Sequence, residues 1–178
     1  NFSILADLIE VDPKQASDYL MNLSKVYRYT LSHLDHDKVT LQEELAFLDR
    51  YLALLQQRFG EGIQVRIAPE VSAKQGKLPP AVLQMLIENA IKHNEHTQAH
   101  PLIINVTTEG QRISVSNRKQ PITTAESTNV GQHNIAERYR LLTSQKVVIN
   151  NSPEDYCVTI PLLLADRKSG SAGMPRPI

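Results

Sequence analysis

The chain has 178 residues, which is enough for one full domain with a helical appendage. Lysine plus arginine and aspartate plus glutamate both number 19, so the formal net charge is zero and no basic field predicts nucleic-acid binding. The single cysteine, Cys157, excludes a disulfide framework within one chain, and we expect it to be a buried small hydrophobe and not a nucleophile. No apolar run reaches the length of a membrane span, so we expect no direct membrane contact of this segment.

Residues 1–60 are predicted to be helical. Residues 1–10 have the pattern of the end of a helix, with apolar side chains at helical spacing. Asp12 followed by Pro13 is typical of a new helix start, because a capping acid there precedes a proline in the first turn. This second helix is expected to end near His33.

A third helix is predicted to begin after Thr40, which can form a capping box with Glu43. Its apolar residues alternate four and three positions apart, as in the seam of a coiled coil. Such a seam needs a partner, so either it packs on the preceding helix or two chains pair through it. The seam consists of Leu41, Leu45, Leu48, Leu52, Leu55 and Phe59.

Residues 61–164 are predicted to form a two-layer α/β unit with its helices on one face of a sheet. The turn Glu109-Gly110 is typical of a tight hairpin. Residues 118–130 are expected to be a mobile loop, and residues 165–178 a disordered tail. Expected strands lie at 63–67, 102–108, 111–117, 147–150 and 156–162, and expected helices lie at 83–94, just after Pro79-Pro80, and at 134–142.

The segment Leu83–Asn94, LQMLIENAIKHN, sorts into two faces when it is drawn as a helix at roughly 100° per residue. Glu88, Asn89 and Lys92 fall together, opposite an apolar arc. Asn89 offers an oxygen of the kind that Mg²⁺ accepts, Lys92 can reach a phosphate, and Glu88 can orient or deprotonate a hydroxyl, imidazole or water. The alternative is an ordinary amphipathic helix whose polar side faces water. The apolar arc consists of Leu83, Leu86, Ile87, Ala90 and Ile91.

This segment resembles the N-box of the nucleotide-binding superfamily that contains gyrase-type, heat-shock and mismatch-repair ATPases and the histidine kinases. Three further segments, in order, resemble the LytS-type (autolysin-sensor) branch of the sensor histidine kinases. They are YRYTL at Tyr27–Leu31, VTLQEELAFLDRYLALLQQRFG at Val39–Gly60 and GQHNIAERYRLL at Gly131–Leu142. The resemblance extends to about Leu164.

The resemblance implies a Bergerat-type ATP-binding fold with a mixed, mostly antiparallel sheet over residues 61–164, after a dimerisation segment over residues 1–60. It implies ATP and Mg²⁺ as cofactors, a homodimer through the N-terminal helices, and a response regulator as partner. The parent would be a bacterial inner-membrane sensor with this chain in its cytoplasmic portion. The family's phosphoacceptor histidine lies just before a segment like Asn1–Leu5, so we expect none in this chain and expect His33 and His36 to be capping or surface residues.

The same resemblance implies roles for single residues. Asn89 would hold Mg²⁺ between the ATP phosphates, Lys92 would contact the phosphates, and Glu88 would assist phosphoryl transfer to a histidine. His93 lies at a position that is often near phosphate, and its alternative is a helix-surface histidine. His96 and His100 are expected at a loop surface, and their spacing is not that of zinc ligands. Asn134 matches the asparagine of the segment Gly131–Leu142, so the resemblance implies a nucleotide-binding role for it, and we expect it to cap the following helix.

Two motifs depart from the family pattern. Where the family has Asp-x-Gly for adenine, this chain has Asn117 and Lys119; Asn117 can still accept through its amide oxygen, but the charge and the glycine are gone. In the loop-closing glycine motif, Gly131 remains and Asn129 replaces the first glycine. The main alternative is therefore a degenerate, non-catalytic dimeric scaffold with a weakened nucleotide site. A third possibility, an ATPase or serine kinase of the superfamily, is disfavoured by the long N-terminal helical region.

Overall fold

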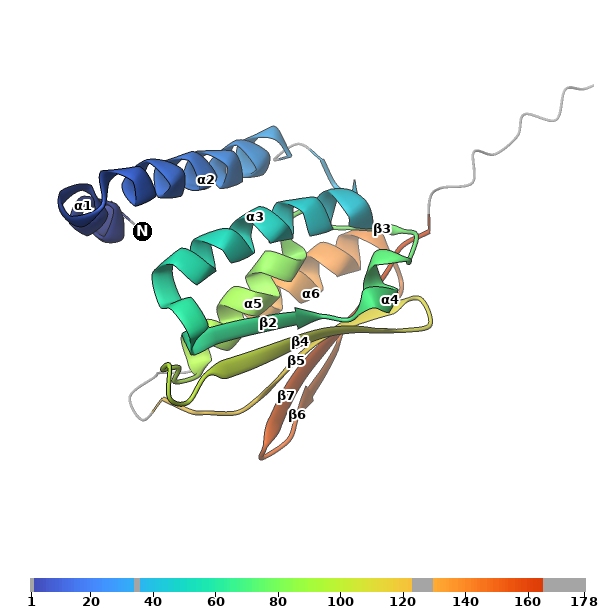
Figure 1. Cartoon of the computed structure of the whole chain (residues 1–178). Coiled ribbons are helices and arrows are strands. Elements are labelled where there is room, and N and C mark those ends of the chain that lie inside the picture. The colour runs from blue at the N-terminus through green and yellow to red at the C-terminus, as the bar shows by residue number, and fades with distance from the viewer. Residues whose placement is uncertain (1, 34–35, 123–129, 165–178) are drawn as a thin grey trace, which may run out of the picture.

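The computed structural model describes residues 2–33, 36–122 and 130–164 (Figure 1). Most of the predicted loop 118–130 and the predicted tail 165–178 therefore lie outside the described residues. The helices are α1 (Phe2–Val11), α2 (Pro13–Ser32), α3 (Leu41–Phe59), α4 (Pro69–Ser72), α5 (Val82–His93) and α6 (Val130–Leu142), with a 3-10 turn at Gly60–Gly62. The strands are β1 (Val39–Thr40), β2 (Ile63–Ile67), β3 (Lys77–Leu78), β4 (Leu102–Glu109), β5 (Arg112–Arg118), β6 (Val148–Asn151) and β7 (Asp155–Pro161).

The five-stranded sheet has the order β2-β4-β5-β7-β6. Strands β2 and β4 are parallel, and the other neighbours are antiparallel. Helices α3, α5 and α6 cover one face of this sheet, and α2 lies beyond α3 (Figure 1). The predicted α+β class, with helices on one face of a mixed, mostly antiparallel sheet after a helical segment, is confirmed.

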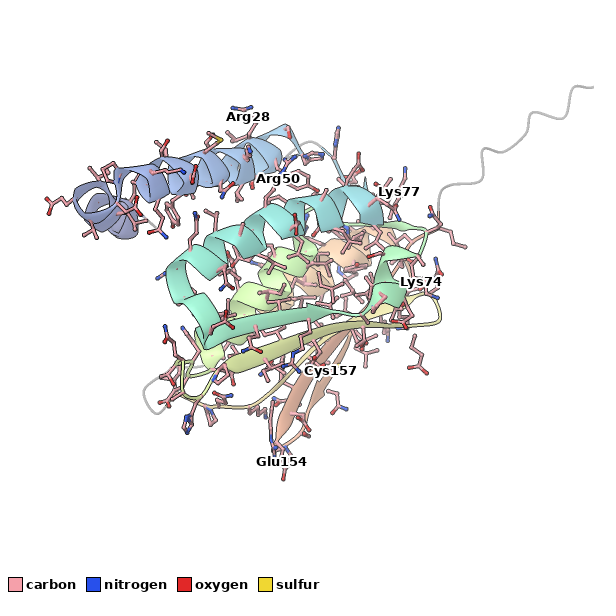
Figure 2. The ribbon with its side chains drawn as sticks, in the orientation of Figure 1. Arg28, Arg50, Lys74, Lys77, Glu154 and Cys157 are labelled. Atoms are coloured by element: carbon pink, nitrogen blue, oxygen red, sulfur yellow. The ribbon has the colours of Figure 1, made fainter. Side chains whose placement is uncertain are left out.

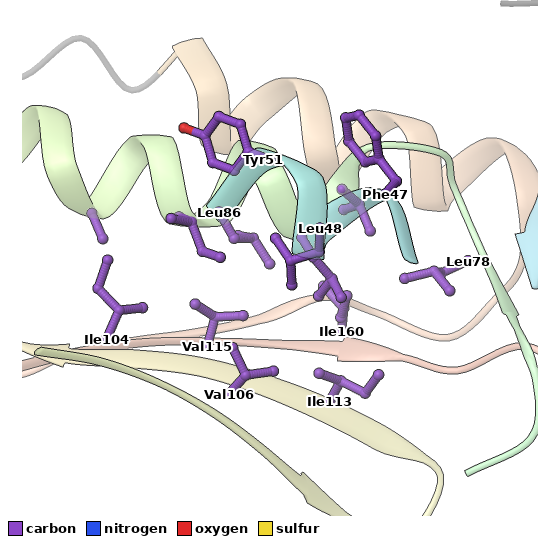
Figure 3. Close-up of a cluster of buried hydrophobic side chains, with 14 of the residues drawn as sticks. Phe47, Leu48, Tyr51, Leu78, Leu86, Ile104, Val106, Ile113, Val115 and Ile160 are labelled. Carbon is purple, nitrogen blue, oxygen red and sulfur yellow. The ribbon is translucent and has the colours of Figure 1, made fainter. Parts of the chain in front are cut away.

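One apolar core joins the helical segment to the sheet. Strand β5 turns Ile113 and Val115 inward, where they meet Leu48 of α3 and Leu86 of α5 (Figure 3). Each fully buried side chain of this kind stabilises the fold by about 1.5–3 kcal/mol. Because α3 contributes to the same core as α5 and the sheet, the expected division of the chain near residue 60 remains a prediction.

The predicted helix starts of α2 and α3 are confirmed. The Asp12 carboxylate accepts a hydrogen bond from the Gln15 amide at 3.0 Å. Thr40 and Glu43 form the capping box, in which the Glu43 amide donates to the Thr40 hydroxyl at 3.2 Å and the Thr40 amide donates back to the Glu43 carboxylate at 2.8 Å. These caps form as predicted because each depends on residues close together in the chain.

Helix α3 buries more than its predicted seam. Phe47, Tyr51 and Leu54 are also buried, whereas Leu45 and Leu52 of the seam are only half-buried. The reason is that α3 has neighbours on two sides, with α2 on one and α5 with the sheet on the other. The seam thus packs within the chain, and pairing of two chains stays a prediction.

Pro79 and Pro80 directly precede Ala81, the N-cap of α5, as predicted. Two predictions are wrong in detail. Cys157 is half-buried and not buried, because the alternation of β7 turns Val158 toward the helices and Cys157 toward the open face of the sheet (Figure 2). Helix α6 begins at Val130 and not at residue 134.

Candidate functional site

Helix α5 presents its predicted apolar arc to the core. Leu83, Leu86, Ile87 and Ala90 are buried together with Val82, whereas Ile91 at the margin of the arc is half-buried. This packing fixes the rotation of α5 about its axis and therefore decides which way each polar side chain of the helix points.

The polar residues of α5 point in two directions. Glu88 is exposed and accepts a hydrogen bond from Gln84 at 3.0 Å. Burial, followed by the nearby Glu88 carboxylate, raises the pKa of Tyr51 of α3. Lys92 lies one turn further along α5 than Glu88, and both residues line a hollow of about 220 Å³ between α2, α3 and α5. Glu88 and Lys92 are thus turned toward the helical segment.

Asn89 lies roughly 100° around the axis of α5 from Glu88, beyond Met85. Its neighbour one turn earlier, Met85, contacts Arg138 of α6, whose Nη1 lies 3.4 Å from the sulfur. The Asn89 side chain is half-buried, and its Nδ2 is shielded from solvent without a hydrogen-bond partner in the described part of the chain. His93, one turn further along, is half-buried. The structure therefore separates Asn89 and His93 from Glu88 and Lys92, although all four were predicted to serve one site.

Asn117 ends the row of inward-facing residues on β5. Its side chain is 3% exposed, and its Nδ2 donates to the Arg118 carbonyl oxygen at 2.9 Å. Tyr156 of β7 is the cross-strand neighbour of Asn117. Its hydroxyl is buried with no hydrogen-bond partner among the described residues. An amide oxygen and a phenol are thus adjacent and directed toward the helices. The sequence reasoning missed Tyr156, although strand alternation with Val158 could have placed it there.

Asn94 fastens the end of α5 to the exit of β5. Its side chain is 4% exposed, donates to the Ala90 carbonyl oxygen at 2.7 Å and accepts from the Gln120 amide at 2.7 Å. The Glu95 amide donates to the Gln120 carbonyl oxygen at 2.6 Å. This link brings Asn117 to the same end of the molecule as the C-terminal half of α5, where Asn89 lies.

The remaining predicted residues are less closely defined. Gly131 is in the first turn of α6, where the structure describes the backbone alone. Asn134 is exposed within α6, so the prediction that it caps this helix is wrong. The Lys119 ammonium donates to the Ser152 carbonyl oxygen, which directs it toward the β6–β7 turn and away from α5.

The two loop histidines differ. His96 is half-buried, with its ring edge-to-face against Phe59 at 4.9 Å between centroids, and His100 is exposed. Within residues 2–33, 36–122 and 130–164, no three His, Cys, Asp or Glu side chains cluster as metal ligands would. No described helix is both long and apolar enough to cross a bilayer.

A larger hollow of about 530 Å³ separates α2 from the start of α5. Glu88, Gln84 and Met85 of α5 line it together with Arg138 of α6 and His33 and His36. His33 stacks on Tyr29 with ring centroids 4.0 Å apart, and its Nδ1 lies 2.9 Å from the Tyr29 carbonyl oxygen. The arrangement places a carboxylate, Glu88, on the side of α5 that faces the helical segment, and an amide with an unused donor, Asn89, roughly 100° further around the helix.

Comparison with known proteins supports the similarity to sensor histidine kinases. Residues 1–63 match the family described as histidine kinase. The chain is 35% identical over 108 residues to the sensor protein kinase HptS of Staphylococcus aureus, and the alignment covers 61% of this chain and 21% of that protein. The chain is therefore homologous to sensor histidine kinases and spans about a fifth of their length.

The solved structures that are similar to this chain include two histidine kinases, both with TM-scores below 0.5. One is the Acinetobacter baumannii histidine kinase AdeS, with a TM-score of 0.47 and 13% identity over 92% of this chain and 83% of that chain. Another is the cytoplasmic segment of the histidine kinase QseC, with a TM-score of 0.46 and 18% identity over 82% of this chain and 93% of that chain.

Proposed function

We propose that this chain is the ATP-binding part of a LytS-type sensor histidine kinase, with the nucleotide held between α5, α6 and the exit of β5. Its domain would be of the Bergerat type, and the phosphoryl group would pass to a histidine outside this chain. The observation that carries the proposal is the Asn89 amide, which is half-buried at the matching motif position with an unused polar atom. A group of this kind is costly to bury unless a ligand satisfies it.

The residues fit a metal–phosphate ligand. An amide has a donor on one side and a carbonyl oxygen on the other, so Asn89 can bind a phosphate oxygen or Mg²⁺ by a half-turn of its last bond. Mg²⁺, when bound, would neutralise charge on the phosphates. His93 would lie beside the same phosphates, whereas Lys92 is turned toward the helical segment, so only the end of its long side chain would reach them as a point charge. Asn117 and Tyr156 would face the adenine.

Glu88 would act on the other side of α5. Its carboxylate, which accepts a hydrogen bond from Gln84 and lies near Tyr51, lines the hollow beneath the helical segment. From that side a carboxylate can orient an imidazole and accept its proton as the phosphoryl group arrives. We therefore assign phosphate binding to the α6 side of the helix and acceptor orientation to the α2 side.

The rest of the relay belongs to the parent protein. We propose that two chains pair through the N-terminal helices, which expose apolar side chains including Ile9, Leu20 and Leu31. The phosphohistidine would then pass its group to an aspartate of a response regulator. The parent is proposed to be a bacterial membrane sensor with this chain on its cytoplasmic side.

A second candidate function is a signalling scaffold of the same fold that no longer turns over ATP. The observation in its favour is Asn117, which carries no charge and whose Nδ2 is already bonded to the Arg118 carbonyl oxygen. Such an amide would recognise adenine more weakly than the aspartate of the family pattern.

Calorimetric titration of ATP with Mg²⁺ separates the two candidates. The kinase proposal predicts binding that Asn89→Ala abolishes and that Asn150→Ala, an exposed asparagine on β6, leaves unchanged. Absence of heat and of thermal stabilisation at millimolar ATP would favour the scaffold. Binding that survives Asn89→Ala would contradict the placement of the phosphates on α5.

A further inference from the structure

Glu44 is a fully buried carboxylate at the meeting point of three helices. It belongs to α3 and is 0% exposed. Its Oε2 accepts a hydrogen bond from the Ala81 amide at 2.9 Å and another from the Tyr29 hydroxyl at 3.2 Å. Its Oε1 accepts from the Leu83 amide at 3.0 Å. The side chain of Glu44 therefore links α3 to α2 and to the start of α5.

The two amides need this carboxylate because α5 lacks a cap of its own. The N-cap is Ala81, which has a left-handed backbone with φ of 60° and no side-chain oxygen. The first amides of a helix have no partner within the helix, and its N-terminal end attracts negative charge. Glu44, far away in the sequence, satisfies both requirements. Where α5 begins is thus set by a residue of α3.

Tyr29 joins α2 to the same carboxylate with a fixed geometry. Its ring stacks on Phe47 of α3 with centroids 4.1 Å apart and planes inclined by 12°. Burial, followed by the neighbouring Glu44, raises the pKa of Tyr29, so that the phenol stays protonated and donates. On the far side, Arg138 of α6 donates to the Pro80 carbonyl oxygen at 2.8 Å, directly before the N-cap.

We infer that Glu44 is a positioning residue for the nucleotide site and that Tyr29 couples the placement of α2 to it. Asn89 lies about two turns beyond the capped amides on the same rigid helix, so a shift of the cap shifts the Asn89 side chain. Movement of α2 that withdraws the Tyr29 hydroxyl weakens the cap and hence nucleotide binding. This coupling rests on the proposed function, because it assumes that Asn89 binds the nucleotide.

The test uses two variants with matched controls. Tyr29→Phe keeps the ring stack and removes the hydroxyl, and Tyr27→Phe removes the hydroxyl of a half-exposed neighbour. Glu44→Gln keeps the shape, but its amide nitrogen faces a backbone amide as donor against donor. Glu109→Gln makes the same change at an exposed carboxylate at the end of β4. Backbone hydrogen exchange at Ala81 and Leu83, measured without nucleotide, reports the cap directly.

The inference predicts faster exchange at Ala81 and Leu83, about threefold in Tyr29→Phe and at least about tenfold in Glu44→Gln, with both controls at the wild-type rate. It also predicts weaker binding of ATP with Mg²⁺ in the same order. Wild-type exchange rates at both amides in Tyr29→Phe would overturn the coupling. Faster exchange with unchanged affinity would overturn the positioning role.

The two proposals fail in different ways. If even the wild-type chain binds no nucleotide, the proposed function fails, and with it the link from Glu44 to the nucleotide. The exchange rates at Ala81 and Leu83 would still decide whether Tyr29 and Glu44 hold the start of α5.

Discussion

Replacement of Asn94 by alanine should destabilise the fold out of proportion to the atoms removed. Two hydrogen bonds of 2.7 Å disappear, one to the Ala90 carbonyl oxygen and one from the Gln120 amide. Each is worth about 1 kcal/mol, and the Gln120 amide left without a partner adds a desolvation cost. We therefore expect a loss of about 2–3 kcal/mol in the free energy of unfolding, out of a total of about 5–15 kcal/mol for a typical domain.

Urea denaturation of Asn94→Ala measures this loss, and Asn150→Ala is the control because Asn150 is exposed on the edge strand. The control should change the free energy of unfolding by less than about 0.5 kcal/mol. Asn94→Asp should also be destabilised, because it keeps an acceptor for Gln120 but turns an oxygen toward the Ala90 carbonyl. A loss below about 0.5 kcal/mol in Asn94→Ala would refute the reasoning that this side chain fastens β5 to α5.

Three other predictions follow from the packing, the caps and the adenine site. Leu48→Ala leaves a cavity at a fully buried position and should lower the free energy of unfolding, measured by urea denaturation, by about 2–5 kcal/mol. Leu20→Ala, at a 49% exposed position, should lower it far less, and equal losses would contradict the assignment of Leu48 to the core. Hydrogen bonds from the Thr40 backbone and side chain lower the pKa of Glu43, so its contribution to stability is present above the ordinary glutamate pKa of 4.5 and is lost as pH falls through the lowered pKa. Glu43→Gln should therefore lose less stability than the wild type over that acidic range, and identical pH profiles would exclude this cap as a cause. Asn117→Asp with Lys119→Gly should tighten ATP binding in calorimetry; unchanged affinity would show that the adenine does not lie at the end of β5.

Local signals in the sequence predicted most of the fold. The capping box at Thr40 and the apolar arc of α5 each depend on residues within one or two turns, so their patterns survive in the folded chain. Cys157 was wrongly predicted to be buried, because its apolar character was weighed above the strand alternation that turns it away from Val158.

Contacts between distant segments could not be predicted. Glu44 lies in a stretch that reads as the polar side of a helix, and its burial follows only from the amides of Ala81 and Leu83, 37 and 39 residues further along. Asn94 likewise reads as an ordinary helix end, and its role depends on Gln120, 26 residues away. Polar contacts between residues so far apart in the chain produce no periodic pattern in the sequence.

The sequence named candidate residues on α5 but could not give the directions in which their side chains point. Glu88 and Asn89 were placed on one polar face because both are polar and lie opposite the apolar arc. Adjacent residues differ by roughly 100°, however, so packing of α5 against the core turns Glu88 toward Tyr51 and Asn89 away from it. Only the neighbours of the helix decide that separation.

The most direct test of the central claim is an NMR titration of the chain with Mg²⁺ and a non-hydrolysable ATP analogue, in which amide and side-chain shifts are followed residue by residue. The account predicts the largest changes at the Asn89 side-chain amide, at His93 and around Asn117, and their loss in Asn89→Ala. Shifts that are confined to the hollow between α2 and α5, around Tyr27 and His33, would place the nucleotide elsewhere and contradict the account.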